Sequence, residues 1–196
     1  MSQFVDGRLR DSSSGAAADV IDPSTGTLVA TITLAGRDDV DQAVRAAKRA
    51  YPGWSRATPG ERSGVLGRFA RLLEARAEEI AQLESRQAGK PIRLAREFDV
   101  PGTIDNVDFF SGAAGNLEGE ATAEYSADHT SSIRREPVGV IGSISPRNYP
   151  LQMAAWKILP AIAAGNTIVL EPAEITPLTS LLFAEIATEA AVPDAS

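Results

Sequence analysis

Three polar side chains follow two short β-branched runs near the end of the chain. Asn148 comes a few residues after the first run, and Glu171 and Glu174 follow the second. An amide at such a position can donate hydrogen bonds to an oxyanion that develops during a reaction. A carboxylate can accept hydrogen bonds from the hydroxyl groups of a ribose. These residue types could therefore bind the hydroxyl groups of a ligand and stabilise a developing negative charge.

The elements that must position these residues read as a strand, a turn, a helix and a second strand. Residues 138–144 are suited to a buried parallel strand, and residues 151–164 are long and apolar enough for a helix. Gly165-Asn166 is a helix stop signal, and residues 167–170 form the second strand. In such a βαβ unit, ligands bind beyond the carboxyl ends of the strands. The pattern predicts an α/β fold with the breaker-rich turn 145–150 at the ligand-binding edge.

The rest of the chain reads as short strands followed by helices. Asp6-Gly7 and residues 22–26 are turn signals beside short strands, which predicts two hairpins. Thr58-Pro59-Gly60-Glu61 is a capping box with proline at the first helical position. Before it we expect a helix that opens at Asp38-Asp39, buries Val40, Ala43, Val44 and Ala47, and ends at Pro52-Gly53. After it we expect a helix that includes 78–84, a helix over 92–115 that kinks or breaks at Pro101-Gly102, a loop over 116–128, a strand over 130–135, and a last helix from Thr176-Pro177.

The composition excludes several classes of partner and site. Acidic residues outnumber basic ones by 26 to 19, and a net charge of −7 argues against nucleic acid or an anionic membrane as the partner. The 196 residues contain no cysteine, which excludes disulfides, thiolate metal sites and a cysteine nucleophile within them. His129 is the only histidine and lies in a polar segment, so we expect it at the surface and expect no metal site. No apolar leader or membrane-spanning run is visible, and we expect a cytoplasmic protein.

Several segments of the sequence resemble the NAD(P)-dependent aldehyde dehydrogenase family. The matching pieces are EPVGVIG, the turn PRNYP, AAWK, LPAIAAGNTIVL and PAEITPLT, and the resemblance runs from about Val5 to Pro193. Such a density of matches is more specific than a lone glycine motif. LESRQAGKP, AEYSADHTSSIRREPVGVIGSISPRNYP and EITPLT are similar to enzymes that oxidise 4-aminobutanal and betaine aldehyde. The resemblance implies NAD-dependent oxidation of an aldehyde, such as the amino-aldehyde 4-aminobutanal, to the carboxylic acid.

The resemblance also implies the N-terminal part of an aldehyde dehydrogenase cofactor-binding domain with one βαβ unit. Within it we expect hairpins over 1–36, a helical part over 37–128, and a linking strand with a βαβα segment over 129–196. In the family, the catalytic cysteine, the general-base glutamate and the remaining strands come after the region that this chain matches. We therefore expect residues 1–196 to be a single incomplete, truncated domain that is inactive by itself.

The family's motifs assign roles to residues at the two strand ends. Asn148 matches the asparagine that helps to stabilise the thiohemiacetal oxyanion, and Glu174 matches a glutamate that binds the adenosine ribose. Two residues depart from the family, because Arg147 stands where tryptophan is common and Glu171 stands where a ribose-binding lysine is common. A second carboxylate would repel a bound anion, so we expect NAD binding to be weak or lost. The cofactor-binding residues implied are Ile144, Ser145, Pro146, Arg147, Glu171, Ala173 and Glu174.

Plainer interpretations remain open for these residues and for the chain. Asn148 could cap the helix that follows it, and Glu171 and Glu174 could be solvated loop residues near a helix start. The chain could also be a non-catalytic interaction partner of a full-length relative, or a weak nucleotide-binding module. We expect a small-molecule aldehyde as ligand by resemblance. Because the sheet is expected to end at an open edge, we also expect a homo-oligomer or pairing with a missing C-terminal half.

Overall fold

The computed structural model describes residues 3–117 and 119–192. Its strands are β1 (Gln3–Val5), β2 (Arg8–Arg10), β3 (Ala17–Ile21), β4 (Leu28–Thr33), β5 (Glu120–Ser126), β6 (His129–Ile133), β7 (Val140–Ile144) and β8 (Thr167–Glu171). Its α-helices are α1 (Arg37–Trp54), α2 (Pro59–Ala75), α3 (Ala77–Ala88), α4 (Ile92–Leu94), α5 (Val100–Ala113), α6 (Pro150–Ala163) and α7 (Leu178–Glu189). The order of hairpins, helices and a β–α–β–α segment agrees with the α/β fold expected from the sequence.

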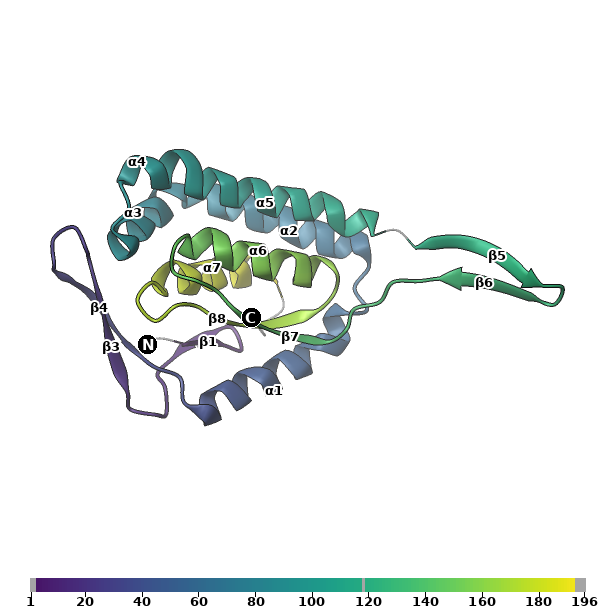
Figure 1. The fold of residues 1–196 in the computed structure, drawn as a ribbon, viewed down its shortest axis with the longest axis horizontal. Helices are drawn as coiled ribbons and strands as arrows, with labels where there is room; N and C mark the ends of the chain where they lie inside the picture. Colours follow the sequence, from purple (N-terminus) through teal and green to yellow (C-terminus); the bar gives the residue numbers. More distant parts are fainter. Residues whose placement is uncertain (1–2, 118, 193–196) are drawn as a thin grey trace.

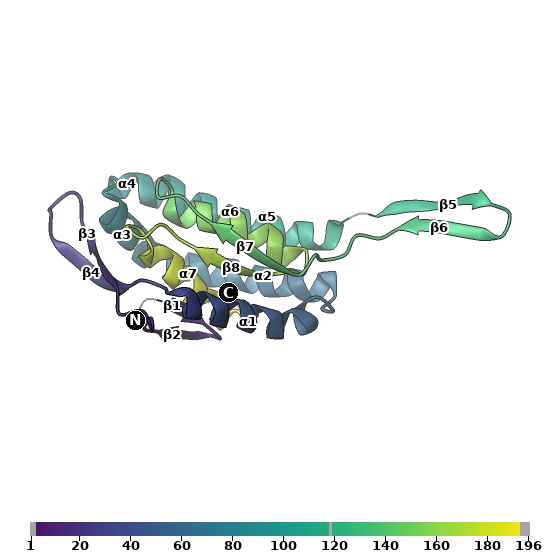
Figure 2. The ribbon, with the colours of Figure 1, turned by 60° about the horizontal axis from the view of Figure 1, so that its bottom comes forward.

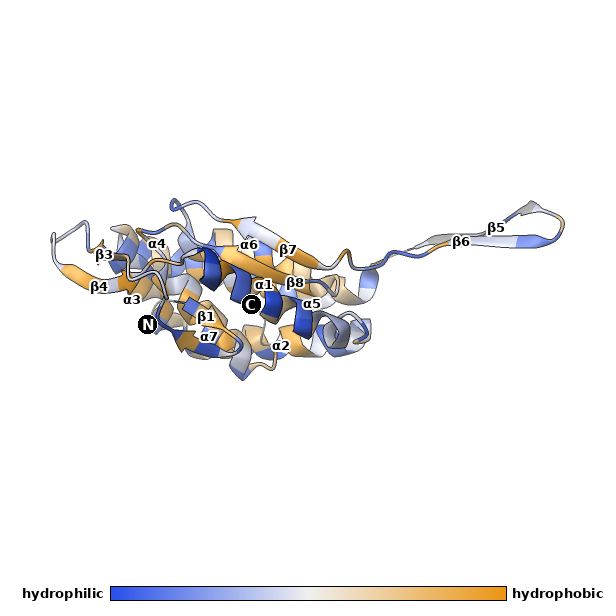
Figure 3. Cartoon of the chain, turned by 90° about the horizontal axis from the view of Figure 1, so that it is seen from below, coloured by the Kyte–Doolittle hydropathy of each residue, from blue (hydrophilic) through white to orange (hydrophobic). Residues whose placement is uncertain are grey.

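The helices and the parallel strands are stacked in layers (Figure 1). The helices α2 and α5 pack against each other and form one outer layer, and α6 and α7 lie between that layer and the strands β7 and β8. Helix α1 contacts β7 and β8 from the other side, where its outward surface is largely hydrophilic (Figure 3). The strand β8 therefore has helices on both sides, as parallel strands require.

The two predicted N-terminal hairpins are confirmed. In the first, Asp6 and Gly7 connect β1 to β2 with φ angles of 56° and 69°. Positive φ at both central residues is the geometry of the two-residue turn that Asp-Gly favours. In the second, β3 pairs antiparallel with β4, and the turn between them is held by Asp22, whose Oδ1 accepts a hydrogen bond from the Ser24 backbone N–H at 2.8 Å.

Helix α1 forms where it was predicted, but the predicted apolar face is wrong at its first turn. Val40 is 49% exposed, whereas Ala47 and Asp39 are buried. The Asp39 carboxylate accepts hydrogen bonds from Ser12 Oγ at 2.6 Å and from the Gly36 backbone N–H at 2.8 Å. These contacts, with the Ser12 hydroxyl first among them, lower the pKa of Asp39 below its ordinary value. The first turn is therefore oriented by a buried carboxylate that fixes the chain before the helix.

The predicted capping box starts α2, and a buried cation of the same helix reaches the end of α6. Thr58 Oγ1 accepts a hydrogen bond from the Glu61 N–H, and Glu61 Oε2 accepts one from the Thr58 N–H at 2.7 Å. One turn further, the buried side chain of Arg62 donates from Nε to the Ala163 carbonyl at 2.9 Å. Because Ala163 is the last residue of α6, Arg62 satisfies a carbonyl that the helix leaves without an internal partner.

Proline does not break the helices where the sequence predicted it. Pro52 lies inside the last turn of α1. Of the predicted kink or break at Pro101-Gly102, the break is wrong, because the chain stays helical and Pro101 falls in the first turn of α5. A π-helical turn at Ala95–Asp99 comes immediately before it. A π-turn shifts the hydrogen-bond register by one residue, so the missing N–H of proline is accommodated there without a break.

The loop predicted for residues 116–128 is wrong over most of its length. Residues Glu120–Ser126 form β5, which pairs antiparallel with β6 and turns back through residues 127–128. The helical part therefore ends at Asn116, well before residue 128. The hairpin extends away from the body of the structure (Figure 2), and every residue of β6 is exposed. Since β6 has no buried residue, its sequence carries no apolar alternation that would have revealed the pairing.

The βαβ unit is confirmed with small shifts of its bounds. The strand β7 begins at Val140, and its parallel register with β8 pairs Val140 with Thr167 and Ile144 with Glu171. Asn166 connects the unit, because its Oδ1 accepts a hydrogen bond from the Gly139 N–H at 3.0 Å. In the described part of the chain, β7 pairs only with β8, and no helix is both long and apolar enough to cross a membrane.

We expect Phe69→Ala to lower the free energy of unfolding by about 3–5 kcal/mol, which is the usual cost of truncating a fully buried phenylalanine. Phe69 is 0% exposed, and its ring centroid lies 4.6 Å from that of Phe183 in an edge-to-face arrangement that joins α2 to α7. Phe98→Ala is the matched control, because Phe98 is 62% exposed and should change the same quantity by less than about 0.5 kcal/mol. Urea unfolding followed by circular dichroism measures both; equal losses would contradict the assigned core.

Candidate functional site

The carboxyl ends of β7 and β8 meet side by side. Ile144 is the register partner of Glu171, and the Ser145 backbone N–H donates a hydrogen bond to the Glu171 carbonyl at 2.9 Å. Ser145 is buried, whereas Ile144 is 72% exposed and the Glu171 side chain faces solvent. Three of the residues predicted for the site are therefore brought together by the pairing of the two strands.

Asn148 lies in the turn between β7 and α6 with its side chain exposed. Within residues 3–117 and 119–192, its amide makes no hydrogen bond. Tyr149 is the N-cap residue of α6, and its side chain makes no capping hydrogen bond. The alternative role of Asn148 as a helix cap is therefore not supported, and its amide can donate to a ligand.

The other predicted residues flank this edge of the sheet. Pro146, Arg147 and Glu174 are exposed, and Ala173 belongs to a turn in which its carbonyl accepts a hydrogen bond from the Thr176 N–H at 3.0 Å. Among the described residues, Arg147 and Glu174 form no ion pair. The strand ends thus present one cation, Arg147, and two carboxylates, Glu171 and Glu174, to solvent.

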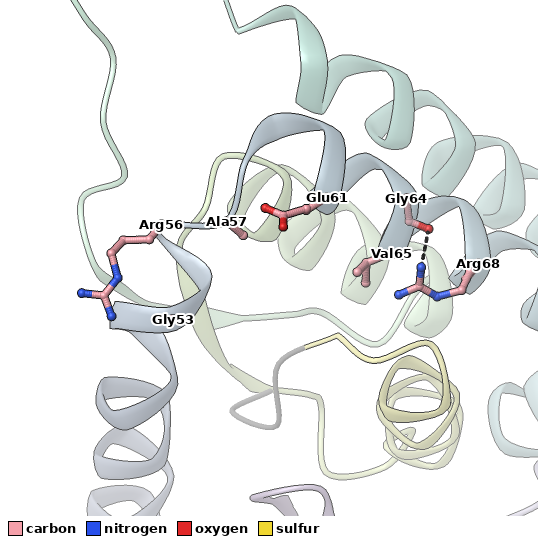
Figure 4. A pocket seen from close by; sticks show the side chains of 7 residues that line it. All are labelled: Gly53, Arg56, Ala57, Glu61, Gly64, Val65 and Arg68. Carbon is pink, nitrogen blue, oxygen red and sulfur yellow. Dashed lines mark hydrogen bonds between the residues drawn. The ribbon is translucent and has the colours of Figure 1, made fainter.

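Two cavities lie away from the strand ends. One, of about 590 Å³, lies between the end of α1 and the first turns of α2 (Figure 4). Two of its charged side chains already have partners, because Glu61 accepts a hydrogen bond from Thr58, and Arg68 donates to the Gly64 and Ala190 carbonyls. The other, of about 350 Å³, lies between the N-terminal hairpins, α3 and α7. Neither cavity includes a residue predicted for the site.

Comparison with known proteins identifies the family of the chain. The model of the aldehyde dehydrogenase family matches residues 9–196. The chain belongs to the aldehyde dehydrogenase family. It corresponds to the N-terminal region of that family, as its motifs implied.

Relatives of the chain are similar both in sequence and in structure. Human 2-aminomuconic semialdehyde dehydrogenase is 41% identical, and the match covers 98% of this chain and 39% of the relative. The crystal structure of a putative aldehyde dehydrogenase from Burkholderia cenocepacia has a TM-score of 0.96 and 42% identity, and the match covers 100% of this chain and 40% of that one. PnpE, in complex with nicotinamide adenine dinucleotide, has a TM-score of 0.95 and 43% identity over 98% of this chain and 39% of its own.

The chain spans about two fifths of the length of these aldehyde dehydrogenases. NAD-dependent oxidation of an aldehyde stays a prediction for this chain. The more specific assignment to enzymes of 4-aminobutanal and betaine aldehyde stays a prediction. The roles of Asn148, Glu171 and Glu174 also stay predictions, which rest on the match of their motifs.

The donor and acceptor groups at the strand ends fit one part of a dinucleotide. Glu171 and Glu174 present exposed carboxylates that can accept hydrogen bonds from the two hydroxyls of a ribose. The exposed guanidinium of Arg147 can donate to a phosphate. Among the other predicted residues, Ile144 and Pro146 offer apolar surface beside these groups. The chemistry of this set fits NAD at its adenosine end.

One residue beside the site was missed by sequence analysis. Glu84 was interpreted only as one of the acidic residues of α3, yet it is 0% exposed. Its Oε1 accepts a hydrogen bond from the Leu151 backbone N–H at 3.4 Å, and its Oε2 accepts one from Thr179 Oγ1 at 2.8 Å. Burial raises the pKa of Glu84, and the hydrogen bonds from Thr179 and Gln87 oppose that rise. The helical spacing of Glu84 and Gln87 carries no signal of burial, because polar residues three positions apart also form a solvated face.

We expect the buried Glu84 to make the stability of the chain decline between mildly acidic and neutral pH. The folded chain holds the Glu84 proton more tightly than the unfolded chain, because its folded pKa is raised above the ordinary value of 4.5. The free energy of unfolding should therefore fall as the pH rises from about 4.5 through the folded pKa. The nearby Lys90 opposes the shift without cancelling it.

Glu84→Gln removes this ionisation and keeps the shape of the side chain. The thermal midpoint of the variant, measured by circular dichroism in a series of buffers from pH 4.5 to 8, should therefore fall less with pH than that of the wild type. Parallel curves for the two proteins would show that Glu84 does not carry the pH dependence.

Proposed function

We propose that this chain supplies the oxyanion-stabilising amide and part of the adenosine site of an NAD-dependent aldehyde dehydrogenase. The observation that carries the proposal is the exposed Asn148 amide, which lies without a described partner beside the paired ends of β7 and β8. The proposed reaction is oxidation of an aldehyde to the carboxylic acid. The proposed substrate class is amino-aldehydes such as 4-aminobutanal, supported by the similarity of LESRQAGKP and the segment before Pro150 to such enzymes.

Asn148 would act while the aldehyde carbon is attacked by a thiolate. The carbonyl oxygen becomes an oxyanion in this step, and a preorganised amide N–H directed at it lowers the barrier. The turn between β7 and α6 suits this role, because no described side chain competes for the amide. The thiolate must come from outside these 196 residues, which hold no cysteine.

NAD, when bound, would accept the hydride from the substrate. In this chain, Glu174 and Glu171 would accept hydrogen bonds from the adenosine ribose, and Arg147 would lie beside the phosphates. Two carboxylates disfavour any additional phosphate on the ribose, so the site should prefer NAD to NADP. Binding should nevertheless be weak, because Glu171 cannot donate the hydrogen bond that a lysine would supply.

We propose two kinds of partner, one for the edge of the β7–β8 sheet and one for the β5–β6 hairpin. In the described part of the chain, β7 pairs only with β8, and strands at the edge of a sheet are ready to pair with another segment. The remaining part of an aldehyde dehydrogenase, in the same or a separate polypeptide, would fit this edge. The exposed β5–β6 hairpin offers a second surface that suits a homo-oligomer. The cytoplasmic location stays a prediction from the sequence.

We expect Asn148→Ala to lower the rate of aldehyde oxidation by roughly 10²–10³-fold in a complex of this chain with the downstream part of a close relative. NADH absorbance with 4-aminobutanal and betaine aldehyde gives the rate. Asn116→Ala is the control, because this exposed asparagine lies at the end of the helical part and donates only to the Gly112 carbonyl. The chain by itself should form no NADH. An undiminished rate in the Asn148 variant would refute the assigned role.

We expect Glu171→Lys to tighten the binding of both cofactors and to tighten that of NADP more. A charge-assisted hydrogen bond contributes about 1.5–3 kcal/mol, which is roughly ten- to hundredfold in affinity. Calorimetric titration of the chain with NAD and NADP measures the change. Glu74→Lys has the same change of charge on an exposed face of α2 and should leave both affinities unaltered. Tighter binding of NADP than of NAD by the wild type would contradict the proposed site.

A further inference from the structure

The start of α6 is capped by a side chain from a distant helix. The helix begins at Pro150, which has no N–H, and Tyr149 before it makes no side-chain cap. The first available N–H is that of Leu151, and it donates to Oε1 of Glu84 at 3.4 Å. Glu84 belongs to α3 and is fully buried, so this acceptor cannot be replaced by water. The turn 145–150, which includes Asn148, is thus held at its end by the hydrogen bond from Leu151 to Glu84.

The start of α7 is capped from the same face of α3. Pro177 makes no side-chain cap, and the Leu178 N–H donates to Oε1 of Gln87 at 2.8 Å. The Gln87 amide also donates to Glu84 Oε2 at 3.0 Å and to Thr179 Oγ1. Thr179 in turn donates to Glu84 Oε2 at 2.8 Å. The two caps are therefore joined in one buried network, and each serves the helix that follows one strand of the site.

Lys90 extends this network to the turn itself. Gly89 ends α3 with a φ of 66°, and a Cβ atom there would approach Pro23 to 2.9 Å, so only glycine fits. Lys90, the next residue, forms an ion pair with the buried Asp99. The same ammonium lies 4.0 Å from the centroid of the Tyr149 ring, next to Asn148. A cation over the ring of Tyr149 restrains the residue that immediately follows Asn148.

We propose that Glu84, Gln87 and Lys90 are positioning residues that hold the two strand-end turns in place for cofactor and substrate. This inference rests on the proposed function, because the turns matter only if Asn148 and Glu174 act as assigned. The Asn148 side chain has no described partner of its own, so its location depends on the residues beside it. Those residues, Tyr149 and Leu151, are the ones that Lys90 and Glu84 hold.

If Glu84 only stabilised the fold, its contact at the start of α6 would be equivalent to a contact at the end of that helix. The opposite end of that helix is anchored by Arg62, a buried side chain that donates to the Ala163 carbonyl at 2.9 Å. Arg62→Met is therefore a matched control for Glu84→Leu, since each removes a buried polar side chain that contacts one end of the same helix. The two variants differ in which end lies beside the site.

Hydrogen exchange of the full 196-residue chain, followed by mass spectrometry, tests the proposal directly. Glu84→Leu should speed exchange about ten- to hundredfold in peptides that cover 145–153 and leave 159–166 unchanged. Arg62→Met should do the reverse. Glu84→Gln keeps an acceptor for the Leu151 N–H and should restore most of the protection. Equal effects of Glu84→Leu and Arg62→Met on both peptides would overturn the proposal.

Gln87→Leu keeps the proposal testable if Glu84→Leu does not fold. It leaves the Leu178 N–H without its acceptor and should speed exchange at 174–182 without the same change at 145–153. Uniform acceleration along the chain, or none at 174–182, would overturn the assignment.

A second readout separates this proposal from the proposed function. In the complex with the downstream part of a relative, Glu84→Leu should lower kcat for aldehyde oxidation at least tenfold, while Arg62→Met retains it. Faster exchange at 145–153 together with an unchanged kcat would support the positioning of the turn and contradict the assigned role of Asn148. Unchanged exchange at 145–153 with a normal fold would overturn the positioning and leave that role intact.

Discussion

The parallel pairing of β7 with β8 is the constraint on which the rest of this structure depends. Parallel neighbours cannot be joined by a tight turn, so a helix must cross from the end of one strand to the start of the next. Most side chains of that helix, α6, are buried among α2, α5, α7 and the strands. Its burial explains why most of the core side chains come from helices, and why the layers have the order seen in Figure 1.

A buried crossover helix leaves polar groups at both ends that water cannot reach. Distant side chains satisfy them here. Arg62 and Trp54 donate to carbonyls at the end of α6, and Glu84 accepts from its first N–H. Because these partners come from α1, α2 and α3, the preceding helices are held in place by hydrogen bonds as well as by apolar contacts. The cost of a buried carboxylate is visible in the raised pKa of Glu84.

The candidate site lies at the carboxyl ends of β7 and β8, where the chain passes from the buried core to the surface. Ser145 is buried and bonded to the Glu171 carbonyl, and the residues that follow each strand are exposed. Buried, hydrogen-bonded strand ends fix the positions of the exposed polar groups that follow them. Further residues could then complete a site around these groups. This arrangement agrees with a chain that spans about two fifths of the length of its aldehyde dehydrogenase relatives.

Local patterns in the sequence determined the hairpins, the capping box of α2 and the βαβ unit, because turn residues, caps and β-branched runs act through near neighbours. The same patterns, read with the family's motifs, placed Asn148 and Glu171 at one edge of the sheet. Only the tertiary structure decided that β5 is a strand, since its partner β6 is exposed along its whole length and shows no apolar alternation. Only the tertiary structure also decided the role of Glu84. Its partners, Leu151 and Thr179, are 67 and 95 residues away, and helical periodicity cannot distinguish a solvated glutamate from one buried against them.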